Sequence, residues 1–376
     1  MVSFVVMFFG IYALMNVYLF LKVYAAAFAL GKLYVVLGLL LAIMVSMPIW
    51  ARRLDSMGHW LAMPVTLVAF SWLAIVFWFA ATGLAIDAWN VVLRMASLVA
   101  PGAGRAIVPG RVLLLSAGAV VAIMTTWGIV EAQSIRANHV TIHVPHMPDG
   151  MNELRIAQIT DLHLGPYTGS WRLGKVLDIV RSEGPDVIVT TGDLIDSPAW
   201  RLAAQAQRLS TLHAPLGKYA VLGNHEFYVG VEESEKFHAQ AGLKLLRGQA
   251  VSPVDGLVIA GVDDRAMGLA ASHENVDELP ILSPRAADSL VILLKHQPRI
   301  NQAAAGLFDL QISGHTHAGQ LFPFHFISRA AYPLYRGLHD LGNGGRLYVS
   351  SGAGTWGPPF RVLARPEVTI FTFTKQ

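Results

Sequence analysis

The chain has 376 residues, of which 54% are hydrophobic and only 14% are charged, and it contains no cysteine. Soluble domains carry about 25% charged residues, so this composition argues against a wholly soluble protein and for a part that lies in lipid. A length above that of the usual single domain predicts two structural units. The absence of cysteine excludes disulfide bonds but is compatible with either side of a membrane.

Four stretches in the first third of the chain carry no charged side chain. They cover residues 1–21, 33–51, 60–86 and 112–130. Each is long enough for the roughly 20 apolar residues that a membrane-spanning helix needs. The first stretch has no basic residue before it and no cleavage site after it, which argues against a signal peptide. We therefore expect residues 1–130 to form a transmembrane domain with four helices.

The formal net charge of +3 is divided unevenly along the chain. Residues 1–130 hold seven basic and two acidic side chains, which leaves 21 of the 28 basic and 23 of the 25 acidic residues in the remainder. The basic excess therefore lies in membrane loops, and no nucleic-acid partner is expected. With the N-terminus outside, inner loops would hold five basic residues against three outside. The positive-inside rule then places the C-terminal region outside the cytoplasm.

After residue 130 the apolar runs become short and alternate with polar residues. The stretch from Asn138 to Pro148 alternates valine and isoleucine with histidine and threonine, which predicts a half-buried strand in a connecting segment, residues 131–153. His139 and His143 share the solvent face of that strand, so we expect them to be surface residues and not metal ligands.

Residues 154–376 contain six further apolar runs that end in polar turns. They are LRIAQITDLHLG, DVIVTTGDLID, YAVLGNHEFY, LVIAGVDD, SLVILLKHQP and DLQISGHTHAGQ. Helix-like stretches lie between several of them, at residues 171–183, 199–212 and 232–241. Strands that alternate with helices predict a layered α/β domain. Ligands bind at the carboxyl ends of strands in such domains, so the residues after each run are the candidates for function.

The residues at these strand ends are carboxylates, an amide and imidazoles. In chain order they are Asp161, His163, Asp193, Asn224, His225, His296, His315 and His317. This mixture suits Mn, Fe, Zn or Co, whereas an all-oxygen set would indicate Ca or Mg. The ligands are too many for one ion and fit two ions that share a carboxylate. We expect Gly192, Gly223, Gly314 and Gly319 to supply backbone freedom at the turns.

The order Asp-x-His, Gly-Asp, Gly-Asn-His-Glu, His, Gly-His-x-His resembles the calcineurin-like metallophosphoesterase superfamily over about Leu154 to Gln376. ITDLHLG, LKHQP, SGHTHAGQLFP and the tail SSGAGTWGPPFRVLARPEVTIFTF are similar to its bacterial branch of membrane-bound and exported enzymes, which includes UDP-2,3-diacylglucosamine pyrophosphatases and cell-wall-associated phosphoesterases. The resemblance implies a four-layer α/β/β/α sandwich. Where that branch often has glycine, this chain has Ala318. A methyl group is tolerated there unless the position needs a positive φ.

The resemblance also implies roles for the strand-end residues. A first metal ion would be bound by Asp161, His163 and His317, a second by Asn224, His296 and His315, with Asp193 bridging the two. His225 would be a non-ligand that donates a proton to the leaving oxygen, and the nucleophile would be a metal-bridging hydroxide. Mn is the first expectation for both ions, with Fe, Zn and Co as alternatives.

Two residues keep two interpretations each. Glu226 could orient a neighbouring ligand, or it could be an ordinary strand-end carboxylate. Arg361 could contact substrate, or it could order the C-terminal loop.

These features together predict a membrane-anchored, dinuclear-metal phosphoesterase of the bacterial inner membrane. It would hydrolyse a phosphoester or pyrophosphate bond, and anchorage in the bilayer favours a lipid-linked or cell-envelope substrate. The aromatic segment 321–338 would be an apolar lip for such a substrate, or would pack over the sandwich. The alternatives are a metal-free scaffold, which the full ligand set disfavours, and a membrane sensor, which the uncharged helices disfavour.

Overall fold

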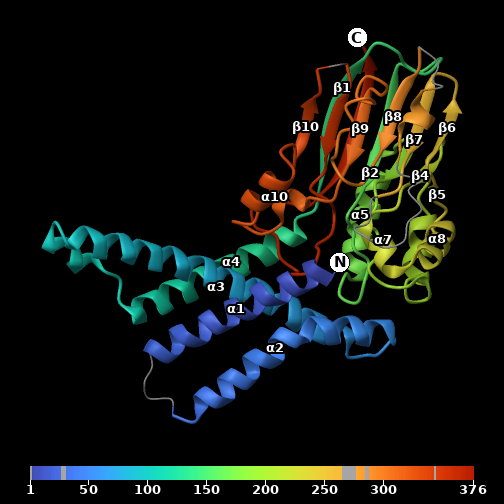
Figure 1. Ribbon diagram of the computed structural model, residues 1–376. Helices are drawn as coiled ribbons and strands as arrows, with labels where there is room; N and C mark the ends of the chain where they lie inside the picture. The colour runs from blue at the N-terminus through green and yellow to red at the C-terminus, as the bar shows by residue number, and fades with distance from the viewer. Residues whose placement is uncertain (1, 27–30, 265–276, 284–287, 343) are drawn as a thin grey trace. The chain divides into compact units, whose positions relative to one another are not determined.

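A computed structural model of the chain describes residues 2–26, 31–264, 277–283, 288–342 and 344–376. The chain forms two compact units (Figure 1). The first comprises residues 1–130 with 357–360, and the second comprises residues 131–356 with 361–376.

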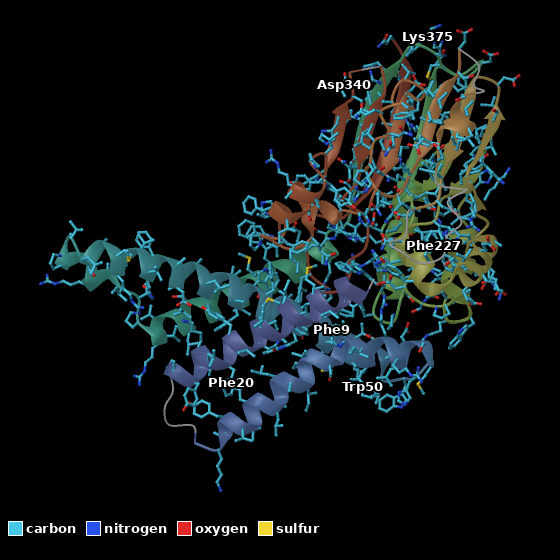
Figure 2. The ribbon with its side chains drawn as sticks, in the orientation of Figure 1. Phe9, Phe20, Trp50, Phe227, Asp340 and Lys375 are labelled. Carbon is cyan, nitrogen blue, oxygen red and sulfur yellow. The ribbon has the colours of Figure 1, made fainter. Side chains whose placement is uncertain are left out.

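The first unit is helical throughout its described elements. Its elements are α1 (Val2–Ala26), α2 (Leu33–Ser56), α3 (Ala62–Ser97), the 3₁₀ helix η2 (Pro101–Ala106) and α4 (Gly110–Gln133), of which the last residues belong to the second unit. All four α-helices are long and apolar enough to cross a membrane, as the four uncharged stretches predict. Large apolar side chains are exposed on them, such as Leu115 and Trp50, the latter labelled in Figure 2. In water these helices would leave apolar surface unburied.

Polar side chains join α1 to α3 inside this unit. Lys22 Nζ lies 2.7 Å from Asp87 Oδ1, and the Tyr18 hydroxyl donates to Asp87 Oδ2 at 2.7 Å. Further along the same helices, Trp72 Nε1 donates to Asn16 Oδ1 at 2.9 Å. Each of these polar groups therefore has a partner on the neighbouring helix, which stabilises it in apolar surroundings.

The second unit contains two six-stranded sheets. The first sheet has the order β1-β12-β2-β3-β4-β5, with β1 (Arg136–Val144), β2 (Glu153–Ile159), β3 (Val187–Thr190), β4 (Lys218–Ala220), β5 (Lys244–Leu245) and β12 (Glu367–Lys375). The second has the order β10-β11-β9-β8-β7-β6, with β6 (Gln249–Val254), β7 (Leu257–Gly261), β8 (Leu290–Leu294), β9 (Leu310–Ser313), β10 (Gly337–Asp340) and β11 (Arg346–Val349). Every run predicted from its alternating or apolar pattern is thus a strand.

Three hydrophobic clusters define four layers. Helices α5 (Ser170–Glu183), α6 (Ala203–Ser210) and α8 (Val231–Gln240) cover the outer face of the first sheet through residues such as Leu177 and Phe237. Apolar side chains of both sheets, including fully buried Phe371, fill the space between them. The short helix α9 (Leu279–Leu282) and the segment containing Phe308 pack on the outer face of the second sheet. The expected α/β/β/α sandwich is therefore confirmed, with a thin fourth layer among the described residues.

One predicted helix differs from the structure. The stretch 199–212 forms a 3₁₀ turn, η3 (Ala199–Arg201), and then α6, with a break at Leu202. Leu202 leaves the helical region with φ −108° and is buried, so tertiary packing overrides the local helical preference.

Parallel pairing brings the carboxyl ends of several strands to one end of the unit. In the first sheet β2, β3 and β4 run parallel to one another, and in the second sheet β8 and β9 do so. The loops that leave these five strands carry the polar residues predicted to form a site. These polar residues are therefore brought together by the pairing of the strands and not by proximity in the sequence.

Candidate metal centre

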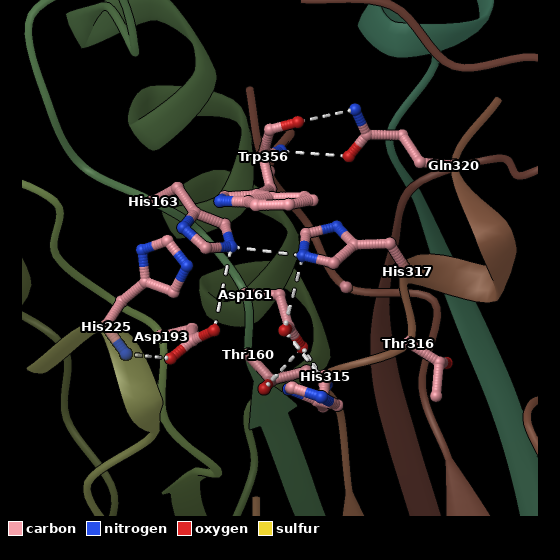
Figure 3. Close-up of polar contacts among 12 residues, drawn as sticks. Thr160, Asp161, His163, Asp193, His225, His315, Thr316, His317, Gln320 and Trp356 are labelled. Atoms are coloured by element: carbon pink, nitrogen blue, oxygen red, sulfur yellow. Dashed lines mark hydrogen bonds and ion pairs between the residues drawn. The ribbon is translucent and has the colours of Figure 1, made fainter. Parts of the chain in front are cut away.

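The structure brings together all eight strand-end residues. Asp161 and His163 follow β2, Asp193 follows β3, Asn224 and His225 begin α7 (Asn224–Val229) after β4, His296 follows β8, and His315 and His317 follow β9. Ligand atoms of Asp161, His163 and His317 lie within 4.8 Å of one another, as do those of Asp193, His296 and His315. Figure 3 shows several of these side chains pointing toward one another.

The first group contains the three residues that the family resemblance assigns to one ion. His163 Nε2 lies 3.0 Å from His317 Nε2, and His317 Nε2 lies 3.4 Å from Asp161 Oδ1. Two ring nitrogens, once they have lost their protons, and a carboxylate oxygen at these separations can bind a single divalent cation.

The second group is centred on His296. Its Nε2 lies 3.1 Å from Asp193 Oδ2, 3.2 Å from Asn224 Oδ1 and 3.1 Å from His315 Nδ1. Asp193 Oδ2 also lies 3.9 Å from His163 Nε2 of the first group. Asp193 is therefore placed between the groups, where a shared carboxylate is needed.

Hydrogen bonds fix the orientation of two of these rings. Nδ1 of His163 donates to Asp196 Oδ1 at 2.9 Å, and Nδ1 of His296 donates to the carbonyl oxygen of Thr191 at 2.7 Å. Since these acceptors are a carboxylate and a carbonyl, each ring directs Nε2 at the centre. Such outer hydrogen bonds accompany histidine ligands of metal ions.

His317 is held differently. The Arg361 guanidinium lies 3.1 Å from its Nδ1 and can only donate, so the proton of the neutral ring is on Nε2. Burial and the charges of His163 and Arg361 keep the pKa of His317 well below its usual range. A cation that binds Nε2 of His317 must therefore displace one proton.

The electrostatics of the centre favour positive charge. Burial acts to lower the pKa of His163, yet Asp196, Asp193 and Asp161 raise it to about 9. Burial likewise opposes ionisation of Asp193, but the neighbouring histidines hold its pKa well below the ordinary value. The carboxylates thus outweigh burial, and a divalent cation would take the place of the protons that they attract.

Backbone strain is concentrated at the candidate ligands. Positive φ angles occur at Asp161 (52°), His163 (49°), Asp193 (52°), His315 (72°) and His317 (49°). The left-handed region costs a non-glycine residue roughly 1–2 kcal/mol. Strain of this kind persists at functional sites, where the surrounding fold holds the side chains in place.

The turn glycines have two different functions. Gly192 and Gly319 adopt φ angles of +91° and +79°, as the prediction of backbone freedom requires. Gly223 and Gly314 do not have a positive φ. A Cβ at Gly223 would collide with the Asp193 carboxylate, and one at Gly314 with the Asp161 carboxylate. The expected reason is therefore wrong at these two positions, where glycine provides space instead.

Ala318 meets the condition under which its methyl group is unfavourable. Its φ and ψ are 50° and 30°, in the left-handed region, and the residue is buried. The alanine is therefore strained at this position.

Glu226 holds the turn that carries Asp193. Its carboxylate is fully buried and accepts hydrogen bonds from the backbone nitrogens of Asp193 (2.8 Å), Leu194 (2.7 Å) and Gly223 (2.8 Å). This geometry corresponds to the orienting interpretation, through the backbone of Asp193 and not its side chain.

Arg361 is fully buried and points inward. It donates to the carbonyl oxygens of Gly354 (2.8 Å) and Ala364 (2.9 Å), besides its contact with His317. Burial lowers the pKa of Arg361 to about 9. The geometry corresponds to ordering of the C-terminal loop and not to contact with substrate.

Asp196 is a site residue that the sequence reasoning missed. Its Oδ1 accepts from Nδ1 of His163 at 2.9 Å and from Nδ1 of His225 at 2.6 Å. Burial acts to raise its pKa, but the two histidines hold it below the usual range. The available signal was its position in GDLID, three residues after Asp193 and on the same turn.

The aromatic segment after the metal-binding turn is largely exposed. Helix α10 (His325–Ala331) has no buried residue, and Phe326 and Ile327 are 63% and 57% exposed. Phe324, which precedes the helix, is 41% exposed. The exposed side chains of this segment are therefore not buried in a packed layer, and its role as a lip stays a prediction.

Comparisons with known proteins agree with this geometry. Residues 154–319 match the family described as calcineurin-like phosphoesterase. The chain is 42% identical over 244 residues to an uncharacterised metallophosphoesterase of Aquifex aeolicus, covering 65% of this chain and 93% of the relative. It is 32% identical over 268 residues to a transmembrane protein with metallophosphoesterase domain of Danio rerio, covering 66% of this chain and 60% of the relative.

Among solved structures, a dimetal phosphatase of Danio rerio aligns with 59% of this chain and 99% of its own, at 15% identity and a TM-score of 0.36. The sequence relationship to the Aquifex aeolicus protein extends over nearly the whole of that relative. The chain therefore belongs to the calcineurin-like metallophosphoesterase family, a family of metal-dependent phosphoesterases.

Proposed function

We propose that the protein is a membrane-anchored phosphoesterase that binds two divalent cations between its sheets. The observation that supports this most strongly is the position of Asp193, with one carboxylate oxygen 3.1 Å from His296 Nε2 and 3.9 Å from His163 Nε2. The first metal would be held by Asp161, His163 and His317, the second by Asn224, His296 and His315, and Asp193 would bridge them. Mn is the first candidate for both positions.

Two divalent cations would lower the pKa of bound water and neutralise charge on the phosphoryl group. The protein supplies the remaining chemistry. His225 is the proton donor to the leaving oxygen, since its ring lies at the centre without being needed as a ligand. Nδ1 of His225 donates to Asp196 Oδ1 at 2.6 Å, which fixes the ring. Nε2 is therefore the atom that donates to the leaving oxygen.

The substrate we propose is an amphiphilic, lipid-linked or cell-envelope phosphoester or pyrophosphate. Four helices of membrane-spanning length keep the enzyme at a bilayer, so substrate and site share a surface. The exposed apolar residues of α10 directly follow the turn that carries His317 and would contact the lipid portion. We place the protein in the bacterial inner membrane with the catalytic unit outside the cytoplasm, and we propose no nucleic-acid partner.

The test uses the full-length protein in detergent, loaded with Mn²⁺. Asp193→Asn should lose at least one equivalent of bound metal and abolish hydrolysis of an aryl phosphodiester. Asp178→Asn is the matched control, because the Asp178 side chain is 76% exposed and lies on α5. An active Asp193→Asn enzyme with its full metal content would show that the protein is not a two-metal hydrolase of this kind.

Membrane side is tested separately. A reporter enzyme fused after Gln376 should be active only outside the cytoplasm. A cytoplasmic signal would overturn that placement without affecting the proposed chemistry.

A further inference from the structure

Trp356 presents an exposed indole beside the proposed proton donor. Its side chain is 45% exposed, although it follows a run of buried residues from Ser350 to Thr355. The Trp356 ring centroid lies 6.1 Å from that of His225, and the ring planes are nearly perpendicular at 84°. Figure 3 shows the indole with the histidines of the metal centre. A partly exposed aromatic ring at this position can contact a group that is bound next to His225.

The backbone that carries this indole is firmly fixed. The Gln320 carboxamide accepts from the backbone nitrogen of Trp356 and donates to its carbonyl oxygen, both at 2.9 Å. The Tyr167 hydroxyl donates to the carbonyl oxygen of Thr355 at 3.1 Å, and Arg361 holds Gly354. Both neighbours on the N-terminal side are thus anchored, while the ring itself is exposed. The loop is therefore pre-organised to hold the indole in place.

The backbone of Gln320, which holds Trp356, is strained. It has a φ of 39° and a ψ of −52°, outside the common regions for a residue with a side chain, and it is buried. It follows His317 by three residues, so one turn carries both a proposed metal ligand and the clamp on Trp356. Strain in a residue whose side chain fixes an exposed ring indicates a functional requirement.

A second aromatic ring flanks the same histidine. Tyr228, on α7, has its ring centroid 5.2 Å from that of His225 at an interplanar angle of 62°, and its side chain is 41% exposed. His225 is therefore in contact with two partly exposed aromatic rings, which come from different parts of the chain. His163 and His317, by comparison, make polar contacts with Asp196, with each other and with Arg361.

We infer that Trp356, assisted by Tyr228, binds the leaving group of the substrate and selects one that carries a planar ring. This inference rests on the proposed function, in which His225 donates its proton to the leaving oxygen. A side chain against His225 then lies on the leaving-group side of the phosphorus. Planar unsaturated rings, as in aryl groups or nucleobases, stack on an indole face.

The experiment measures binding without turnover. Phenylphosphonate, cyclohexylphosphonate and methylphosphonate are titrated calorimetrically into the full-length, Mn²⁺-loaded protein in detergent. Phenylphosphonate should bind more tightly than the other two. Trp356→Ala should weaken phenylphosphonate binding about 2- to 10-fold, the range of an aromatic pair contact, and leave methylphosphonate unchanged. Trp356→Phe should retain most of the preference.

Trp200→Ala is the matched control, since Trp200 is 60% exposed on η3 and its ring contacts the guanidinium of Arg201. It should change none of the three affinities. Equal affinities of phenyl and cyclohexyl compounds for the wild-type protein, or an unchanged phenylphosphonate affinity in Trp356→Ala, would overturn the inference and leave the proposed function standing. A wild-type protein with no metal-dependent affinity for methylphosphonate would instead overturn both.

Discussion

The carboxylate of Asp196 serves a proposed metal ligand and the proposed proton donor through one oxygen atom, so we expect Asp196→Asn to impair both. Asparagine has nearly the same shape and can still accept at Oδ1, but it lacks the charge. The two hydrogen bonds, at 2.6 and 2.9 Å, then change from charge-assisted to neutral. That difference is about 1–1.5 kcal/mol per bond.

At limiting Mn²⁺ two such losses sum to about 2–3 kcal/mol, which corresponds to a decrease in kcat/KM on the order of 100-fold. At saturating Mn²⁺ only the loss through His225 remains, about 1–1.5 kcal/mol or roughly 10-fold. The share that acts through His225 depends on the leaving group, because a poor leaving group needs the proton more. We therefore expect a larger loss for methyl phenyl phosphate than for methyl p-nitrophenyl phosphate. The share that acts through His163 should instead weaken Mn²⁺ binding about 10-fold.

The assay measures kcat/KM for both esters at saturating Mn²⁺, where only the loss through His225 remains. A separate Mn²⁺ titration measures the loss of metal affinity through His163. Asp178→Asn serves again as the exposed control. A loss below about 3-fold, or an equal loss for both esters, would refute the assignment of Asp196 as the residue that positions His225.

Three further outcomes are expected. Gly314→Ala should lose bound metal, because the new Cβ would collide with the Asp161 carboxylate. Gly169→Ala, which has open space around its Cβ, should keep its metal. Equal metal content of the two variants by elemental analysis would contradict this. Ala318→Gly should raise the free energy of unfolding by up to about 1 kcal/mol, because glycine relieves the strain of the left-handed φ. Ala204→Gly, in α6, should instead lower the free energy of unfolding by about 1 kcal/mol. A destabilised Ala318→Gly protein in thermal unfolding would disprove the strain. Mn²⁺ affinity should rise with pH between 7 and about 9, because His163 must lose its proton to bind metal. An affinity independent of pH in this range would refute the raised pKa.

The fold could be predicted because its signals are local in the chain. Strands β1, β2, β3, β4, β7, β8 and β9 follow from their apolar or alternating patterns, and the four uncharged stretches identify the four long helices. Strands β5, β6, β10, β11 and β12 were not predicted, since their positions depend on pairing with distant strands. The exception at Leu202 arises because its burial in the core, which no local pattern encodes, interrupts the helix.

The site could be predicted only as far as strand ends mark it. Asp196 and Trp356 were not found, because their importance lies in contacts with His225, which is 29 residues from one and far along the chain from the other. The sequence also did not distinguish the functions of Gly192 and Gly314. Gly192 needs a positive φ, whereas Gly314 needs room for the carboxylate of Asp161, which is 153 positions away in the chain.

Each proposed cation would draw ligands from both sheets: Asp161 and His163 come from the first and His317 from the second, while Asp193 and Asn224 face His296 and His315 in the same way. An ion at either position would cross-link the two sheets through its ligands, in addition to any role in chemistry. Chelation should then loosen the contact between the sheets as well as stop turnover. Metal supply would thereby set the lifetime of the folded catalytic unit as well as its rate.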